Sequence, residues 1–201
     1  MALSELLWAC PRCGRDRGLD EQGVCAGCGA HFRRGRGARI VARLPDGEEV
    51  VRPAADWVDA LPDPASILHA DHDGARRSAR GSARSVSGDR AIFGETGYLN
   101  RVELYGEARP VVLALFPDHI TVTWHGEGEE TETWSLEDLT AVQASSRTLQ
   151  LKARGRPLTS FRFDHDSVYL WEALMHAALR DFYGRTGRGV IVEFQPRIVV
   201  R

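Results

Sequence analysis

The chain has 201 residues, 43% of them hydrophobic, which suits one medium-sized domain together with a smaller one. Its longest apolar run, residues 111–116, is too short to cross a bilayer, and its first residues lack the basic and apolar regions of a secretory signal. The formal charge of −2 divides into +4 over residues 1–45, −4 over 46–100 and −2 over 101–201. We expect a cytoplasmic protein, with peripheral association at the inner membrane face left open.

Two Cys-x-x-Cys-Gly motifs, with eleven residues between Cys13 and Cys25, contain every cysteine of the chain: Cys10, Cys13, Cys25 and Cys28. Four thiolates complete the tetrahedral coordination of a structural zinc ion. The glycine after each pair tolerates the positive φ that such a tight turn often needs. A disulfide pair or a redox dithiol is the alternative, but a thioredoxin-type dithiol needs one pair beside a βαβ pattern, which does not follow here. We therefore predict a structural zinc site.

Residues 1–37 form the predicted zinc module. The segment between the motifs is polar and offers only Leu19 and Val24 for burial, and about 30 residues cannot close a hydrophobic core alone. Zinc binding, on the order of 10–16 kcal/mol in comparable peptides, would supply the folding energy. His31 is a metal ligand by residue type, but four cysteines already close the site, so we interpret it as an ordinary polar residue.

Residues 38–61 are predicted to form a hairpin and a short helix. Apolar residues flank Pro45-Asp46-Gly47, whose residue types favour a turn, and a helical pattern over 54–61 ends before Pro62. Residues 62–97 are rich in Arg, Ser and Gly and poor in apolar side chains, so we predict a linker there. Twenty-five of the 26 basic residues are Arg, which we interpret as bacterial codon bias rather than as a chemical requirement.

From residue 98 the sequence predicts short strands at a regular spacing. Side chains alternate between apolar and polar, as in Ile120, Val122 and Trp124 against Thr121 and Thr123. Strands this regular predict an antiparallel sandwich or barrel. The predicted strands are 99–105, 110–116, 119–125, 130–136, 140–146, 148–153 and 158–163.

One amphipathic helix follows the predicted strands. Asp164 or Asp166 is expected to cap its start and Gly184 to end it. Apolar residues from Val168 to Phe182 recur at i, i+3, i+4 and i+7 and form one broad stripe. Residues 185–201 are predicted to contain a further strand, interrupted at Pro196.

Two resemblances follow from these patterns. The paired knuckles resemble a zinc ribbon or rubredoxin-like module. Residues 98–184 resemble the pleckstrin-homology-like (PH-like) fold, in which two bent antiparallel sheets form a seven-stranded barrel and a C-terminal helix plugs one end. The segments that carry this second resemblance are 134–142, 148–152, 161–163 and 171–175. The fold class predicted is mainly β with one C-terminal α-helix, plus the small zinc ribbon.

The sequence contains no recognisable catalytic motif, so we predict a non-enzymatic adaptor. The PH-like resemblance implies recognition of a protein partner or an anionic membrane surface. The loop 105–109, where that family commonly holds inositol phosphates, offers one arginine and one acid. The predicted partner-binding residues are therefore a basic strip elsewhere, Arg147, Lys152, Arg154 and Arg156, for which a merely solvated face is the alternative.

Two other functions remain open at this point. The sequence ends within a strand-like segment, which suggests the regulatory region of a larger enzyme that acts on lipids. The net +4 of the zinc module, with its Arg33, Arg34 and Arg36 cluster, suggests nucleic-acid binding, but that cluster lacks interleaved aromatic residues. Neither the oligomeric state nor the identity of the partner follows from the sequence.

Overall fold

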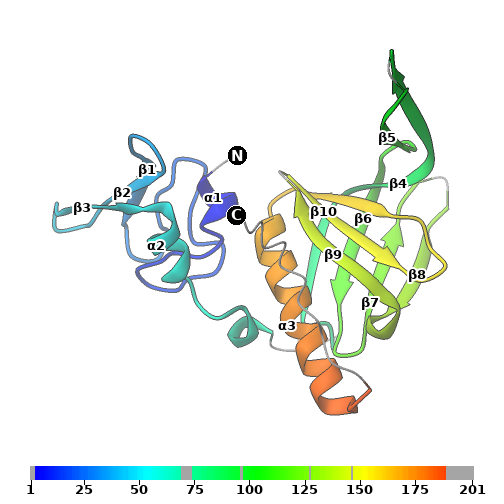
Figure 1. The fold of residues 1–201 in the computed structure, drawn as a ribbon. Coiled ribbons are helices and arrows are strands. Elements are labelled where there is room, and N and C mark those ends of the chain that lie inside the picture. The colour runs from blue at the N-terminus through cyan, green and yellow to red at the C-terminus, as the bar shows by residue number, and fades with distance from the viewer. Residues whose placement is uncertain (1–2, 69–73, 96, 127, 146, 189–201) are drawn as a thin grey trace.

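The computed structural model describes residues 3–68, 74–95, 97–126, 128–145 and 147–188. A small N-terminal part surrounds the four cysteines, and a larger part consists of a curled antiparallel sheet and one long helix (Figure 1). The prediction of a mainly β chain with a C-terminal helix is confirmed. Within the described ranges, no helix has the length and hydropathy needed to cross a membrane.

The N-terminal part combines the cysteine motifs with the predicted hairpin and short helix. A three-stranded antiparallel sheet has the order β1-β2-β3. Its Phe32 ring packs edge-on against Trp57 with ring centroids 5.4 Å apart, and the Trp57 indole Nε1 donates to the Ile40 carbonyl at 3.2 Å. The hairpin and helix thus supply the apolar side chains that the cysteine segment lacks. The elements are α1 (Leu3–Leu6), β1 (His31–Arg34), β2 (Arg39–Arg43), β3 (Glu49–Pro53) and α2 (Ala54–Asp59).

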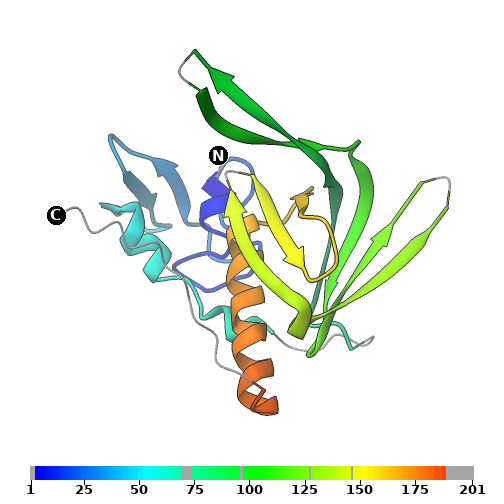
Figure 2. The ribbon, with the colours of Figure 1, turned by 45° about the vertical axis from the view of Figure 1, so that its right-hand side comes forward.

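The larger part is an eight-stranded sheet. Seven strands have the order β8-β7-β6-β4-β11-β10-β9, and β5 pairs with the far half of β4 as a projecting hairpin (Figure 2). A short 3-10 turn, η1 (Pro64–Ile67), precedes the sheet, and η2 (Leu136–Asp138) joins β8 to β9. The strands are β4 (Arg77–Gly94), β5 (Gly97–Tyr105), β6 (Arg109–Leu115), β7 (His119–Trp124), β8 (Glu130–Ser135), β9 (Leu139–Ser145), β10 (Thr148–Ala153) and β11 (Thr159–Phe163).

The linker predicted over residues 62–97 is wrong for residues 77–94, which form strand β4. This strand has 18 residues, and its first half is the middle strand of the seven, paired with β6 on one side and β11 on the other. Its inward residues Ala79, Gly81 and Ala83 are small, so the strand lacks the bulky apolar alternation by which the sequence revealed the others. The Cβ of a larger residue at Gly81 would lie 2.1 Å from the Arg162 carbonyl oxygen of β11, so this close approach of the two backbones requires glycine.

The inner face of the curl is filled by apolar side chains and closed by α3 (Val168–Thr186). In β7 and β10 every second residue is buried, as the alternation predicted. Trp171 of α3 is fully buried and stacks on Phe163 of β11 with ring centroids 5.1 Å apart. Figure 2 shows α3 lying along the open side of the curled sheet.

The ends of α3 differ from the expected ones. Ser167 caps its start, with its hydroxyl accepting from the Leu170 N–H, whereas Asp164 or Asp166 was expected. The helix ends at Thr186, and Gly187 adopts a left-handed φ of 63°, so Gly184 lies inside the last turn. Asp166 is occupied elsewhere, as described next. The predicted strand beyond residue 188 lies outside the described residues.

A buried ionic network joins the two parts. The Asp166 carboxylate is 1% exposed and accepts hydrogen bonds from Arg17, at 2.6 and 2.8 Å, and from Arg77, at 2.8 and 3.2 Å. The Trp171 indole donates to the same carboxylate at 2.9 Å, and Arg77 also reaches Asp16 at 2.8 Å. Trp8, two residues before the first cysteine, packs into the core of the larger part. The cysteine segment is therefore docked on the start of α3.

Candidate functional site

The two cysteine motifs fold into matching turns. Gly14 N–H donates to the Cys10 carbonyl at 2.8 Å, and Gly29 N–H donates to the Cys25 carbonyl at 2.9 Å. Both glycines have the expected positive φ, 73° and 70°. Each turn is closed by a second bond, from Cys10 N–H to the Arg15 carbonyl and from Cys25 N–H to the Ala30 carbonyl. The sequence thus folds into two equivalent knuckles that present their thiols towards each other.

The four Sγ atoms lie within 4.8 Å of one another. Cys10 Sγ and Cys28 Sγ are 3.6 Å apart, as are Cys13 Sγ and Cys25 Sγ. A disulfide would bring two sulfurs to about 2.05 Å. Four ligands at about 2.3 Å around a tetrahedral zinc lie about 3.8 Å apart, close to the spacing seen here. The cysteines therefore fit a metal ion, and the donor set of four thiolates suits zinc.

The thiols lie in different environments. Burial raises the pKa of Cys10 to about 12. Burial also disfavours the Cys25 thiolate, but backbone N–H donors of Cys28 and Gly27 outweigh it, and the pKa of Cys25 is lowered to about 7. Gly27 N–H lies 3.3 Å from that sulfur. Thiols must be deprotonated to bind metal, and N–H donors at the sulfurs favour that form.

His31 does not join the cysteines. Its Nε2 lies 3.2 Å from the Gln22 carbonyl oxygen, and it is absent from the only group of metal-ligating side chains found among the described residues. This agrees with its interpretation as an ordinary polar residue. The cysteine set is complete without it.

The predicted basic strip is not a row of free cations. Lys152 donates to the Arg156 carbonyl, Arg154 lies 3.8 Å from the Asp138 carboxylate, and Arg156 forms an ion pair with Glu132. Arg147 is exposed at the opposite end of β10. The structure thus brings Lys152, Arg154 and Arg156 together and separates Arg147 from them. Binding of a partner by these residues stays a prediction.

A cluster of two tryptophans and a carboxylate, which the sequence analysis did not single out, lies near the strip. The two oxygens of Glu132 accept from Trp124 Nε1 at 2.7 Å and from Trp134 Nε1 at 3.0 Å. Two guanidinium groups stack on these rings, Arg109 on Trp124 and Arg156 on Trp134, each 5.1 Å from the ring centroid. Alternation along β8 placed Glu132 on the inward face beside Trp134, which is the signal that could have revealed it.

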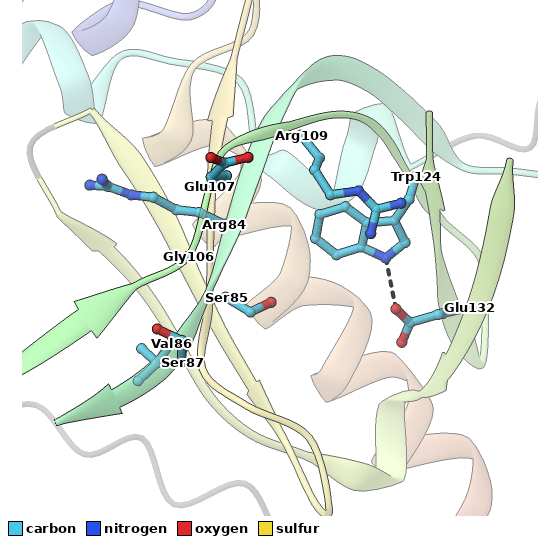
Figure 3. A pocket seen from close by; sticks show the side chains of 9 residues that line it. All are labelled: Arg84, Ser85, Val86, Ser87, Gly106, Glu107, Arg109, Trp124 and Glu132. Atoms are coloured by element: carbon cyan, nitrogen blue, oxygen red, sulfur yellow. Dashed lines mark hydrogen bonds between the residues drawn. The ribbon is translucent and has the colours of Figure 1, made fainter. Parts of the chain in front are cut away.

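A cavity of about 370 Å³ opens beside this cluster, where the β4–β5 hairpin leaves the sheet (Figure 3). The loop between β5 and β6 contributes Glu107 to its wall, the start of β6 contributes Arg109, and Trp124 of β7 also lines it. Figure 3 shows the Arg109 guanidinium over the Trp124 ring and the Glu132 carboxylate below the indole nitrogen. The cavity wall therefore includes two cations that stack on rings, Arg84 and Arg109, and two carboxylates, Glu107 and Glu132.

Comparison with known proteins adds no assignment to these sites. No family model matches the chain, and a search of curated proteins finds no match.

Proposed function

We propose that this is a non-enzymatic, zinc-containing binding protein with an N-terminal zinc ribbon and a PH-like domain, which recognises a protein partner or an anionic membrane surface. The observation that carries this proposal is the curled sheet with α3 along its open side. Two antiparallel halves bend about the shared strand β4, three strands to each side of it. This arrangement supports the PH-like assignment, because that fold plugs two bent antiparallel sheets with a C-terminal helix.

Strand β4 modifies the assignment in two ways. The PH-like unit begins at residue 77 on this reading, 21 residues earlier than the sequence predicted, because β4 supplies its first strand. The projecting β4–β5 hairpin is an insertion between the first and second strands of that unit. The loop 105–109, from which the sequence predicted no phosphate binding, has one arginine, Arg109, which is stacked on Trp124.

The zinc ribbon has a structural role in this proposal. Four cysteines leave no open coordination position for a substrate. Cys10 and Cys25 are buried in the same core as Phe32 and Trp57, so a bound metal would hold that core together. The ribbon in turn docks through Arg17 on Asp166.

The experiment immobilises the full chain, with its metal, and measures retention of proteins from the native host and of anionic vesicles. The matched variant carries Arg147→Gln, Lys152→Gln and Arg154→Gln, and leaves Arg156 in place because its ion pair with Glu132 supports the fold. We expect saturable retention that weakens in the variant and with salt, because exposed charges act over about 8 Å at physiological salt. Absence of any retained protein or vesicle would overturn the proposal.

A further inference from the structure

The outward face of the seven-stranded sheet has an unusual chemistry. The core residues of each strand point inward, so the alternate positions point out. None of the outward positions carries Asp or Glu, and none carries Trp, Tyr or Phe. By strand they are 78, 80, 82 and 84 in β4; 110, 112 and 114 in β6; 119, 121 and 123 in β7; 131, 133 and 135 in β8; 141, 143 and 145 in β9; 148, 150 and 152 in β10; and 160 and 162 in β11.

Three of the four Lys and Arg residues of this face lie on β4 and its neighbour β11, and the fourth is Lys152 of β10. Arg80 and Arg84 belong to β4, the middle strand, and Arg162 lies on β11 directly opposite Ser82. At about 3.4 Å per residue and 4.8 Å between strands, the Cα atom of Arg162 lies roughly 8 Å from those of Arg80 and Arg84. The three arginines, defined here as the crest arginines, are all exposed.

The crest arginines are not neutralised within the part of the chain that the structure describes. Arg80 and Arg162 form no side-chain ion pair there, and Arg84 stacks on the Tyr105 ring at 4.7 Å. Three acids flank the crest but lie off the face: Glu103 on the hairpin accepts from the Tyr105 hydroxyl, Glu107 lines the same cavity as Arg84, and Asp164 follows the end of β11. Around the crest, Ser, Thr and Gln side chains supply further hydrogen-bond donors.

Such a face complements a layer of phosphate groups. Guanidinium, hydroxyl and amide groups all donate hydrogen bonds, whereas phosphodiester oxygens only accept them. A single-stranded nucleic acid would need aromatic side chains for its bases, and this face has none. The six spacings between seven neighbouring strands, at about 4.8 Å each, add up to roughly 29 Å along the sheet. The sheet is therefore too wide for a DNA major groove of about 12 Å. The outward face of the curled sheet is convex, so the crest arginines on its middle strands can approach a flat layer of phosphates closely.

We propose that the crest arginines bind the headgroup phosphates of an anionic lipid bilayer, with the convex face of the sheet lying against the membrane. This inference rests on the proposed function and adds the crest arginines to the predicted strip, whose Lys152 lies on the same outward face. Each basic residue near an anionic leaflet contributes about 1 kcal/mol. Three of them would raise partitioning roughly 100-fold, at 1.4 kcal/mol per tenfold.

The test measures co-flotation of the full, metal-loaded chain with vesicles of phosphatidylcholine containing about one third phosphatidylglycerol. The variant R80Q/R84Q/R162Q should lose binding roughly 100-fold, and R80K/R84K/R162K should keep most of it. The matched control is R36Q/R39Q/R43Q, which removes three exposed arginines from the N-terminal part and should bind like the parent. The thermal unfolding midpoints of all variants check that the sheet is intact.

Four outcomes would overturn this inference. They are equal binding to neutral vesicles, unchanged binding by R80Q/R84Q/R162Q, an equal loss in the R36Q/R39Q/R43Q control, and tighter binding to random-sequence duplex DNA than to the anionic vesicles. Retention of a protein partner without any vesicle binding would also overturn it, while the proposed function would stand.

Discussion

Arg77 of β4 and Asp166, just before α3, form a two-bonded ion pair, with Nη2–Oδ1 at 2.8 Å and Nε–Oδ2 at 3.2 Å. Both side chains are at least nine-tenths buried, and Arg17 from the cysteine segment adds two more bonds to the same carboxylate. The pair therefore links the central strand, the long helix and the N-terminal part at one point.

Removing the charge of Asp166 should destabilise the protein strongly. We expect Asp166→Asn to lower the free energy of unfolding by about 3–5 kcal/mol, because the buried Arg77 guanidinium loses its buried partner and keeps only the more exposed Asp16. Urea denaturation measures this change. The control is Asp181→Asn, whose side chain is 37% exposed beside Arg76 and Arg185 and should contribute no more than about 1 kcal/mol. Equal effects of the two substitutions would contradict the special role of Asp166.

The lowered pKa of the Asp166 carboxyl group predicts how the stability of the protein depends on pH. Burial disfavours its ionised form, but hydrogen bonds from Arg17 and Arg77 outweigh burial and lower the pKa of Asp166 from 3.8 to about 2. A lowered pKa stabilises the fold above the unfolded value of about 3.9, and that stability, roughly 2 kcal/mol, is lost as pH falls towards 2. Unfolding followed between pH 5 and pH 2 should show this loss in the parent and not in Asp166→Asn.

Metal removal should unfold the N-terminal part. The protein purified without an affinity tag should contain about one zinc ion per chain, and Cys25→Ser should lose it. Because Cys10 and Cys25 share a core with Trp57, loss of the metal should change tryptophan fluorescence. Metal analysis and fluorescence of Cys25→Ser and of the control His31→Ala measure the effect. Zinc retained by Cys25→Ser, or lost by His31→Ala, would contradict a site made of the four cysteines alone.

The close pairing of β4 with β11 predicts that a larger residue in place of Gly81 destabilises the protein. Gly81→Ala should lower the free energy of unfolding by about 2–3 kcal/mol, because its Cβ would meet the Arg162 carbonyl oxygen at 2.1 Å. The control is Gly88→Ala in the same strand, where nothing lies within 4 Å of a Cβ and the change should stay within about 0.5 kcal/mol. Chemical denaturation of the two variants compares them. A neutral Gly81→Ala would argue against this strand register.

Glu132 should contribute more to the stability of the fold than an ordinary, partly exposed side chain. Glu132→Gln replaces one acceptor oxygen by an NH2 group that faces an indole N–H and the Arg156 guanidinium. We expect a loss of about 1–3 kcal/mol, the usual effect of leaving such donors without an acceptor. Glu130→Gln, exposed two residues earlier in β8, is the control and should be neutral. Urea midpoints of both variants provide the measurement.

The strands that could be predicted from the sequence are those with large inward residues. The two knuckles could be predicted because metal coordination requires a regular spacing of the cysteines. Strands β6 to β11 were found because residues such as Val122 and Leu149 alternate with polar neighbours. Strand β4 was missed because Ala79, Gly81 and Ala83 leave no apolar periodicity, although Arg80, Ser82 and Arg84 alternate with them. A rule that looks for small residues at period two would have found it.

The junction between the two parts could not be predicted in the same way. Arg17 and Asp166 are 149 residues apart, and neither lies in a motif that indicates a partner. From the sequence, Arg17 is indistinguishable from an ordinary surface charge, and Asp166 is predicted only as a possible helix cap. Their pairing depends on where β4 and α3 place Arg77 and Trp171, which only the folded chain determines.

This long separation has a consequence for the order of synthesis. Arg17, which follows Trp8 and the first knuckle, leaves the ribosome 149 residues before the aspartate on which it docks, roughly 7–30 s at 5–20 residues per second. During that interval Trp8 has no core to enter, because the sheet and α3 that surround it are still incomplete. Early capture of the metal would give the nascent N-terminal part a fixed shape while it waits for the rest of the protein.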